Sequence, residues 1–173
     1  MNTKIKVTVL LLLFIIVGFM LYVIITKIEH KKAIEENIKI IPEFAFTKLT
    51  DKKIFTNREL KSDRSKLIIY FNTECDHCMC EAEQISQNIE QFSNFQIIMI
   101  SYEEIDTLQA FAEKYNFTEQ NNITVLQDKK FEFDDIFGRS PIPTSFIYNK
   151  NKDLIKKFVG EVKIEALLKY LNE

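Results

Sequence analysis

The sequence has little of several residue types whose abundance would mark a special class of protein. Of its 173 residues, three are glycine, three are proline, three are cysteine and none is tryptophan. So few glycines and prolines exclude a collagen-like or linker-rich chain, and three cysteines are too few for a small scaffold held together by disulfides. The cysteines must therefore be interpreted by their positions.

The chain also lacks an excess of charge of one sign. It carries 23 basic and 25 acidic residues, for a net charge of −2 and a pI near 5.8. Because no basic field would neutralise a phosphate backbone, we expect no nucleic-acid binding. The content of 46% hydrophobic and 28% charged residues is that of a globular protein, and the length suits one domain with an appendage.

One long apolar run without charges, residues 7–25, follows a short tail of residues 1–6. As a helix, its 19 residues would reach roughly 28 Å, close to a hydrocarbon core of about 30 Å. A cleavable signal peptide would have a shorter apolar core followed by small residues, whereas Ile-Thr-Lys-Ile follows here at residues 25–28. A buried core helix would need an amphipathic face, which this run lacks. The pattern predicts an uncleaved transmembrane anchor.

The charges that flank this anchor do not decide its orientation. Lysines stand on both sides of it, at Lys4, Lys6, Lys27, Lys31 and Lys32. Residues 26–41 are mostly polar with isolated apolar residues, which predicts a helical stalk that ends before Pro42. The soluble domain is then expected over residues 42–173.

Within residues 42–173 the spacing of apolar residues changes repeatedly between strand and helix types. Two nearly continuous apolar runs, residues 66–71 and 95–100, predict central strands that are buried on both faces. Apolar residues at three- and four-residue spacing between them predict a helix over residues 81–92, which completes a βαβ unit. Similar patterns predict a hairpin over residues 44–55, strands at residues 123–126, 144–148 and 154–159, and helices around residues 108–115 and 164–171. The pattern is typical of an α/β domain.

The residues that can do chemistry are concentrated where the first central strand gives way to a helix, in the sequence FNTECDHCMCE at residues 71–81. Thr73 and Asp76 fit the capping box of a helix start, which predicts Cys75 in the first turn. Unpaired N–H groups and the positive helix end would favour a thiolate there, and Cys78 lies three residues on, within reach of a disulfide. We therefore expect an exchanging dithiol in which Cys75 is the nucleophile and Cys78 resolves the mixed disulfide.

A strand, a Cys-x-x-Cys at a helix start and a later Ile-Pro-Thr before another strand form the signature of the thioredoxin fold. With these motifs, residues 42–173 resemble the membrane-anchored TlpA/ResA-type thioredoxin-like proteins of bacteria. The resemblance implies a thioredoxin-like fold, with a central mixed sheet flanked by helices, an N-terminal hairpin and a preceding transmembrane helix. Cys75 and Cys78 match the redox pair, Glu81 matches the acidic residue that often follows it, and Pro143 matches the cis-proline.

The function that this resemblance implies is thiol–disulfide exchange with proteins outside the cytoplasmic membrane. A single-pass anchor at residues 7–25 would have its N-terminus inside and the catalytic domain on the periplasmic side. Electrons would pass to or from a membrane thiol reductase or oxidase, and no cofactor is expected beyond the redox-active Cys75–Cys78 disulfide. Ile142, Pro143 and Thr144 would shape a groove in which an extended substrate strand pairs with the backbone.

Three residues around the cysteines are expected to tune the redox pair in opposite directions. His77 holds the position that histidine occupies between the cysteines of DsbA-type oxidants, where a positive charge would favour the Cys75 thiolate. Glu74 replaces the usual tryptophan, and with Asp76 it disfavours the thiolate by like-charge repulsion. Thioredoxin at about −270 mV and DsbA at about −120 mV mark the extremes of such pairs, and the sequence leaves open which extreme this pair approaches.

Other interpretations of the motif are weaker. A metal carrier of the Sco type would use Cys75, His77, Cys78 and Cys80, but four ligands within six residues of one helix cannot converge on a tetrahedral centre, and the Sco-type Cys-x-x-x-Cys spacing is missing. A peroxiredoxin-like peroxidase would use Thr73 two residues before Cys75, but Ile69 stands where that motif has proline. A redox-inert membrane adaptor would need neither cysteine. Cys80 is expected to be a small buried hydrophobe rather than a third redox partner.

Overall fold

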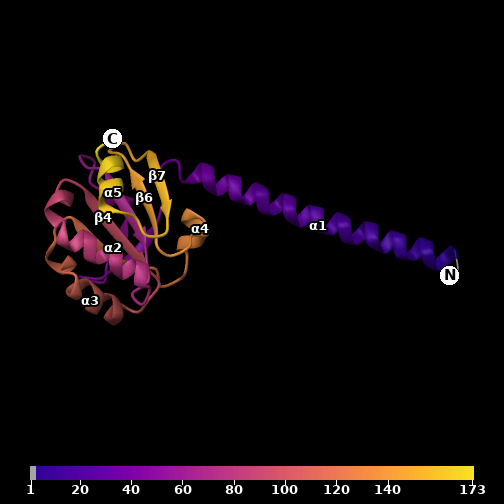
Figure 1. Ribbon diagram of the computed structural model, residues 1–173, viewed down its shortest axis with the longest axis horizontal. Helices are drawn as coiled ribbons and strands as arrows, with labels where there is room; N and C mark the ends of the chain where they lie inside the picture. The colour runs from indigo at the N-terminus through magenta and orange to yellow at the C-terminus, as the bar shows by residue number, and fades with distance from the viewer. Residues whose placement is uncertain (1–2) are drawn as a thin grey trace. The chain divides into compact units, whose positions relative to one another are not determined.

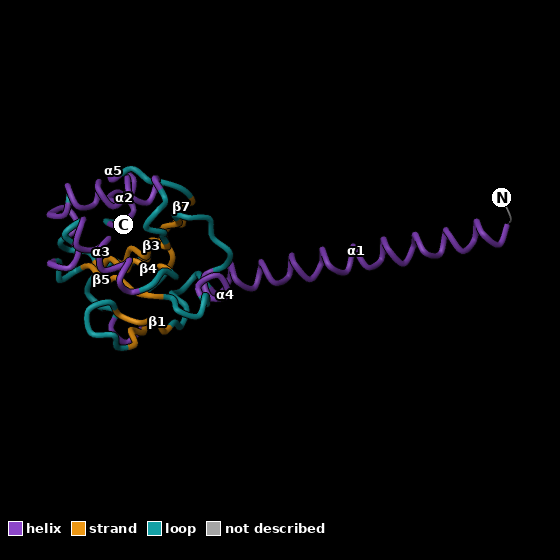
Figure 2. The backbone as a smooth tube through the Cα atoms, turned by 90° about the horizontal axis from the view of Figure 1, so that it is seen from below, coloured by secondary structure: helices purple, strands orange, loops and turns teal. Residues whose placement is uncertain are grey.

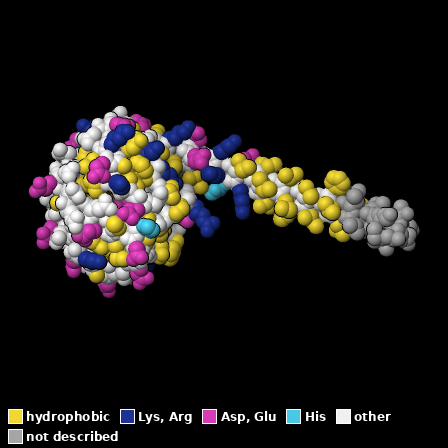
Figure 3. All heavy atoms as spheres, in the orientation of Figure 1, with side chains coloured by type: hydrophobic (Ala, Val, Ile, Leu, Met, Phe, Trp, Pro, Cys, Tyr) yellow, Lys and Arg dark blue, Asp and Glu magenta, His cyan; other side chains and the backbone are white. Residues whose placement is uncertain are grey.

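The computed structural model describes residues 3–173 and divides the chain into two units, at residues 1–36 and 37–173. The first unit is formed by the long helix α1, Thr3–Asn37. From Leu11 to Ile25 its side chains are mostly hydrophobic and exposed, and charged side chains follow toward Asn37 (Figure 3). By length and composition, α1 could cross a membrane. The expected tail begins at residues 1–2, which lie outside the described residues.

The second unit is built on one seven-stranded mixed sheet with the order β2-β1-β5-β4-β3-β6-β7. Its strands β4, β6 and β7 are labelled in Figure 1. The strands β3, β4 and β5 are parallel, and the other neighbours pair antiparallel. Their bounds are β1 Ala45–Lys48, β2 Ile54–Thr56, β3 Lys66–Tyr70, β4 Gln96–Ser101, β5 Ile123–Gln127, β6 Thr144–Tyr148 and β7 Leu154–Val159. The expected hairpin and strands are confirmed, and the central mixed sheet is the one that the resemblance implied.

Helices cover one face of this sheet with the main apolar core. The longer ones are α2 Asp76–Gln87, α3 Ile105–Lys114 and α5 Ile164–Leu171, and α2 and α5 lie on one side of the strands in Figure 2. Alternate residues of the central strands, such as Leu67, Ile69 and Met99, pack against them. The helix expected over residues 81–92 begins earlier, at Asp76, and is followed by a separate 3₁₀ turn, Ile89–Phe92.

The other face of the sheet carries a cluster of aromatic rings that the apolar spacing did not reveal. Tyr70 on β3 stacks on Phe133 at 4.0 Å between ring centroids. Phe133 begins a short helix, α4 Phe133–Phe137, which periodicity cannot detect because it has little more than one turn. The carboxylate of Asp128 accepts hydrogen bonds from the N–H groups of Glu132 and Phe133, both at 2.9 Å, and so fixes the start of α4.

The second unit includes residues 37–41, which the sequence analysis assigned to the stalk. Ile38 and Ile41 are buried. The N–H of Leu154 donates to the carbonyl of Lys39 at 2.8 Å, and the N–H of Ile41 donates to the carbonyl of Lys152 at 3.0 Å. The isolated apolar residues at the end of the stalk therefore pack on the domain, next to the start of β7.

Candidate functional site

The two cysteines of the Cys-x-x-Cys motif lie where β3 ends and α2 begins. Cys75 is the N-cap residue of α2 and is half-buried, and Cys78 lies one turn into the helix and is buried. The Cys75 side chain lies near enough to the Cys78 thiol to contribute to raising its pKa. Cys75 is thus the accessible member of the pair, and Cys78 is the buried one.

The capping box expected at the start of α2 is wrong. The helix begins two residues later than the motif suggests, at Asp76 after the N-cap Cys75, and the Cys75 side chain makes no capping hydrogen bond within the described chain. Thr73 is instead bound by Glu103, whose two carboxylate oxygens accept its N–H and its hydroxyl, both at 2.7 Å. Because Glu103 takes the Thr73 hydroxyl, that hydroxyl does not cap the helix.

Glu103 is a site residue that the sequence analysis missed. It follows β4, and the carboxyl ends of the parallel strands β3 and β4 lie at the same edge of the sheet. A second contact joins the same two loops, since the side-chain amide of Asn72 donates to the Tyr102 hydroxyl at 3.1 Å. The sign that could have revealed Glu103 is a carboxylate placed directly after the neighbouring parallel strand.

Behind the cysteine pair, the carboxyl group of Glu81 is buried, and one of its two oxygens accepts a hydrogen bond. Its side chain is 2% exposed, and Ser145 on β6 donates to Oε1 at 3.0 Å. Its Oε2 has no hydrogen-bond partner among the described residues. Burial raises the pKa of Glu81 to about 7. Glu81 thus changes its protonation state close to neutral pH.

Glu81 and Cys78 line the same small enclosed space, together with Pro143 and apolar core side chains. Burial strongly raises the pKa of the Cys78 thiol, and the charge on Glu81 raises it further. Cys78 is therefore protonated in the reduced protein, and its proton must be removed before it can act as a nucleophile.

On the outer face of α2, His77 is exposed and meets Glu161 from the connection between β7 and α5. The imidazole Nδ1 of His77 lies 2.9 Å from Oε2 of Glu161. Cys80 is exposed on this face as well, so the expectation that it is buried is wrong. Cys78 faces the core, and a residue two positions further on points away from it. Glu74 and Asp76 are also exposed, so acidic side chains flank the motif.

The Ile142–Pro143 peptide bond is cis, as the family resemblance implied. Ile142 is half-buried and packs, like Cys75, against the apolar core. Thr144 is completely buried, and its hydroxyl donates to the carbonyl of Pro141. The carbonyl of Pro143 accepts the N–H of Gly160 at 2.8 Å. Of the three expected groove residues, Ile142 is therefore the one whose side chain reaches the surface.

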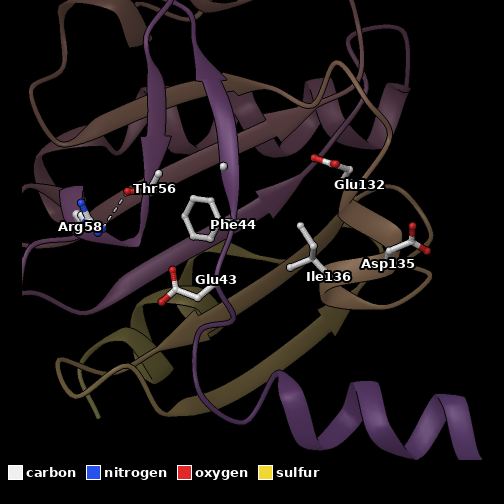
Figure 4. Close-up of a pocket in the computed structure, with 8 residues that line it drawn as sticks. Glu43, Phe44, Thr56, Arg58, Glu132, Asp135 and Ile136 are labelled. Carbon is white, nitrogen blue, oxygen red and sulfur yellow. Dashed lines mark hydrogen bonds between the residues drawn. The ribbon is translucent and has the colours of Figure 1, made fainter.

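A separate cavity of about 580 Å³ lies between the hairpin and α4 (Figure 4). Its charged lining consists of Glu43, Arg58, Glu132 and Asp135, and neither cysteine of the pair contributes to it. Among the described residues, no three histidine, cysteine, aspartate or glutamate side chains are grouped so that they could hold a metal ion. The chemistry that the arrangement supports is thiol exchange at Cys75 and Cys78.

Comparison with known proteins agrees with this geometry. The sequence profile of the AhpC/TSA family matches residues 39–157. The thiol-disulfide oxidoreductase ResA of Bacillus cereus is 30% identical over 173 residues, which cover 97% of this chain and 94% of the relative. ResA of Oceanobacillus iheyensis is 20% identical and covers 94% of this chain and 85% of the relative.

Solved structures show the same fold. A secreted disulfide oxidoreductase of Mycobacterium tuberculosis that is homologous to DsbE of Escherichia coli superposes with a TM-score of 0.64 at 18% identity, covering 79% of this chain and 97% of that one. StoA of Bacillus subtilis superposes with a TM-score of 0.58 at 14% identity, covering 76% and 98%. At these identities the likeness concerns the fold.

Proposed function

We propose that this chain, which belongs to the AhpC/TSA family and is a thiol–disulfide oxidoreductase with a thioredoxin-like fold, works from a membrane anchor through Cys75 and Cys78. The observation that carries the proposal is the placement of the two cysteines. Cys75 is accessible at the N-cap of α2, and Cys78 is buried behind it within hydrogen-bonding reach. One thiol can therefore meet a substrate while the other is kept for the second step.

In the reducing direction, the Cys75 thiolate attacks one sulfur of a substrate disulfide. The substrate S–S bond breaks, the first substrate thiolate leaves, and a mixed disulfide with Cys75 forms. The Cys78 thiolate then attacks the Cys75 sulfur, which releases the second substrate thiolate and closes the Cys75–Cys78 disulfide. Two electrons pass from the dithiol to the substrate, and the oxidising direction is the exact reverse.

Glu81 is assigned as the acceptor of the Cys78 proton in the second step. The mixed disulfide cannot be resolved until the Cys78 thiol is deprotonated, and burial disfavours its thiolate. A carboxyl that shares the same enclosed space and has a pKa of about 7 can take up this proton near neutral pH. The Ser145 hydrogen bond to Oε1 leaves Oε2 available for it.

Charged side chains around the motif are expected to shift the reduction potential of the cysteine pair in opposite directions. His77, Glu74 and Asp76 are assigned as tuning residues, and Glu161 offsets the positive charge that His77 would bring. Ile142 and the backbone around Pro143 are assigned to the substrate groove, with Thr144 as its buried support. The reaction requires protein thiols or disulfides as substrates and no cofactor beyond the Cys75–Cys78 disulfide.

The location that we propose is the cytoplasmic membrane of a bacterium, with residues 7–25 as a single span and the catalytic unit on the periplasmic side. The apolar helix α1 and the bacterial relatives support it. Electrons would then come from, or go to, a membrane thiol reductase or oxidase. Cleavage of residues 37–173 by a protease added outside intact spheroplasts would support this orientation, and complete protection of the catalytic unit would contradict it.

The decisive experiment is a redox titration of the full-length chain in detergent, equilibrated in glutathione or dithiothreitol buffers, with alkylated cysteines counted by mass spectrometry. We expect one reversible two-electron couple in which Cys75 and Cys78 lose alkylation together, while Cys80 stays alkylated. A potential near about −270 mV would identify a reductant, and one near about −120 mV an oxidant. The absence of a reversible couple would overturn the proposal.

A further inference from the structure

Glu161 lies at the centre of a cluster of side chains on the outer face of α2, outside the Cys75–Cys78 pair. Besides the 2.9 Å contact with His77 Nδ1, its Oε1 accepts the side-chain amide of Gln84 at 3.2 Å. Gln84 also donates to the Cys80 sulfur at 3.6 Å, and the Cys80 thiol lies near enough to the Glu161 carboxylate for that group to raise its pKa. Glu161 and Gln84 therefore bring His77 and Cys80 of α2 into one cluster.

The position of Glu161 is set by the residue before it. Gly160 has φ 87, a conformation that residues with a side chain rarely adopt. Its N–H donates to the carbonyl of Pro143 at 2.8 Å. The connection between β7 and α5 is thus bound to the cis-proline loop, and the next side chain reaches α2 from there. This arrangement makes the Glu161 contacts part of the fold rather than an incidental meeting of surface groups.

An exposed third thiol close to an exchanging pair could take part in unwanted thiol–disulfide exchange. Substrate disulfides approach Cys75, and a Cys80 thiolate nearby could attack them or join two copies of the chain. Only the thiolate is an effective nucleophile. A carboxylate that accepts the thiol hydrogen keeps the proton on sulfur, and its negative charge opposes formation of a second negative charge beside it.

We propose that Glu161 confines thiol exchange to Cys75 and Cys78 by holding Cys80 as an unreactive thiol. This inference rests on the proposed function, because it needs an exchanging pair to protect. His77 supports Glu161 in this role, since its hydrogen bond lowers the pKa of the Glu161 carboxyl and keeps it ionised. Glu161 is in turn the main cause that raises the pKa of Cys80, as a hydrogen-bond acceptor and through its charge; the hydrogen bond from Gln84 lowers this pKa, and the charge of Glu81 raises it.

The test uses the full-length chain with the Cys75–Cys78 disulfide closed, so that Cys80 is the remaining free thiol. The rate of its alkylation by iodoacetamide is measured from pH 6 to pH 10 by mass spectrometry. In Glu161→Gln, which keeps the side-chain shape and removes the charge, we expect the rate profile to move to lower pH. At pH 7.5 the rate should rise about three- to tenfold, which corresponds to a pKa change of up to about one. Glu165→Gln, at an exposed carboxylate in the first turn of α5, is the matched control and should leave the profile unchanged.

A second readout follows reoxidation of the fully reduced chain. Glu161→Gln should form disulfides that include Cys80, and Cys80→Ser in the same background should remove them. The inference is overturned when the alkylation profile of Cys80 in Glu161→Gln coincides with that of the wild-type chain and reoxidation yields only Cys75–Cys78. A wild-type chain with no reversible Cys75–Cys78 couple would instead overturn the proposed function, so the two failures are distinguishable.

Discussion

On each face of α2, a cysteine lies near a glutamate, but one pair is buried and the other is exposed to solvent. On the inner face, Cys78 and Glu81 are buried, and removal from water is the main cause that raises the pKa of both. On the outer face, Cys80 and Glu161 are exposed, and hydrogen bonds are the main causes, raising the pKa of Cys80 and lowering that of Glu161. The same pair of residue types is thus suited to proton transfer inside and to restraint of a thiol outside.

The largest expected difference between the two faces is the effect on turnover when their cysteines are substituted. Cys78→Ser should trap the mixed disulfide on Cys75 and reduce turnover with a disulfide-bonded protein by at least about a hundredfold, because the resolving nucleophile is lost. Cys80→Ser should keep turnover within about twofold of wild type, since surface thiols outside the pair take no part. Insulin reduction and mass spectrometry of trapped adducts measure both. Equal losses of turnover in the two variants would show that the cysteines of the two faces do not differ in this role.

The carboxylate of the inner face should control the rate of resolution. In the wild-type chain, the rate at which Cys78 releases a bound substrate thiol should rise with pH through about 7, the pKa of Glu81. Glu81→Gln should slow this step by about 10²-fold and flatten its pH profile in this range, as expected for loss of a general base. Stopped-flow measurements on a preformed mixed disulfide test it. Glu83→Gln, at an exposed carboxylate of the same helix, should behave like wild type.

The same carboxylate should reduce the stability of the fold at neutral pH. The pKa of Glu81 rises from an ordinary value of 4.5 to about 7 on folding, so between these values the native state binds more protons than the unfolded state. Its contribution to stability is therefore greatest below pH 4.5 and falls as pH rises to 7. Glu81→Gln should raise the free energy of unfolding at pH 8 by up to about 3 kcal/mol relative to the effect at pH 4.5.

Urea unfolding of the wild-type chain and the variant at the two pH values measures this difference. Glu83→Gln again provides the control, because an exposed carboxylate changes its surroundings little on unfolding. If the benefit of Glu81→Gln were the same at both pH values, the carboxyl would not be the buried titrating group that the inner face requires.

The smallest expected effect concerns the histidine of the outer face. Because the Glu161 carboxylate lies 2.9 Å from its imidazole, His77 contributes little net charge to Cys75. His77→Asn should therefore change the reduction potential of the Cys75–Cys78 couple by less than about 30 mV, which is about 1.4 kcal/mol for two electrons. In the Glu161→Gln background the same substitution should have a larger effect. A large change in the single variant would show that Glu161 does not compensate His77.

The main features of the sheet and of the redox pair could be predicted from local patterns. The central strands β3 and β4 are continuous apolar runs because they are buried on both faces, and that burial is visible in any short window. The Cys-x-x-Cys spacing is likewise a local property, since positions three apart share a helix face. The short helix α4 could not be predicted in this way, because it has too few residues to show a period and is fixed by Asp128 and aromatic packing.

The sequence-based predictions were wrong where a residue far away in the sequence binds a group for which a local pattern predicted another partner. Thr73 has the spacing of a capping residue, yet Glu103 from the next strand takes its N–H and its hydroxyl. The spacing of Cys80, two residues after the core-facing Cys78, turns it away from the core, but no local pattern indicated that Glu161 would reach this face from the end of β7. These contacts join residues that are far apart along the chain, and no local pattern records such distances.

The sequence by itself determined an apolar helix long enough to cross a membrane, the order of the strands and the longer helices, and the position of two cysteines where a strand gives way to a helix. These follow from the length of an apolar run, from its period and from the spacing of two thiols, all of which are local. Only the tertiary structure decided which carboxylate meets which thiol. Burial and close contact set the protonation of Cys78, Cys80, Glu81 and Glu161, and both arise when separate segments of the chain pack together.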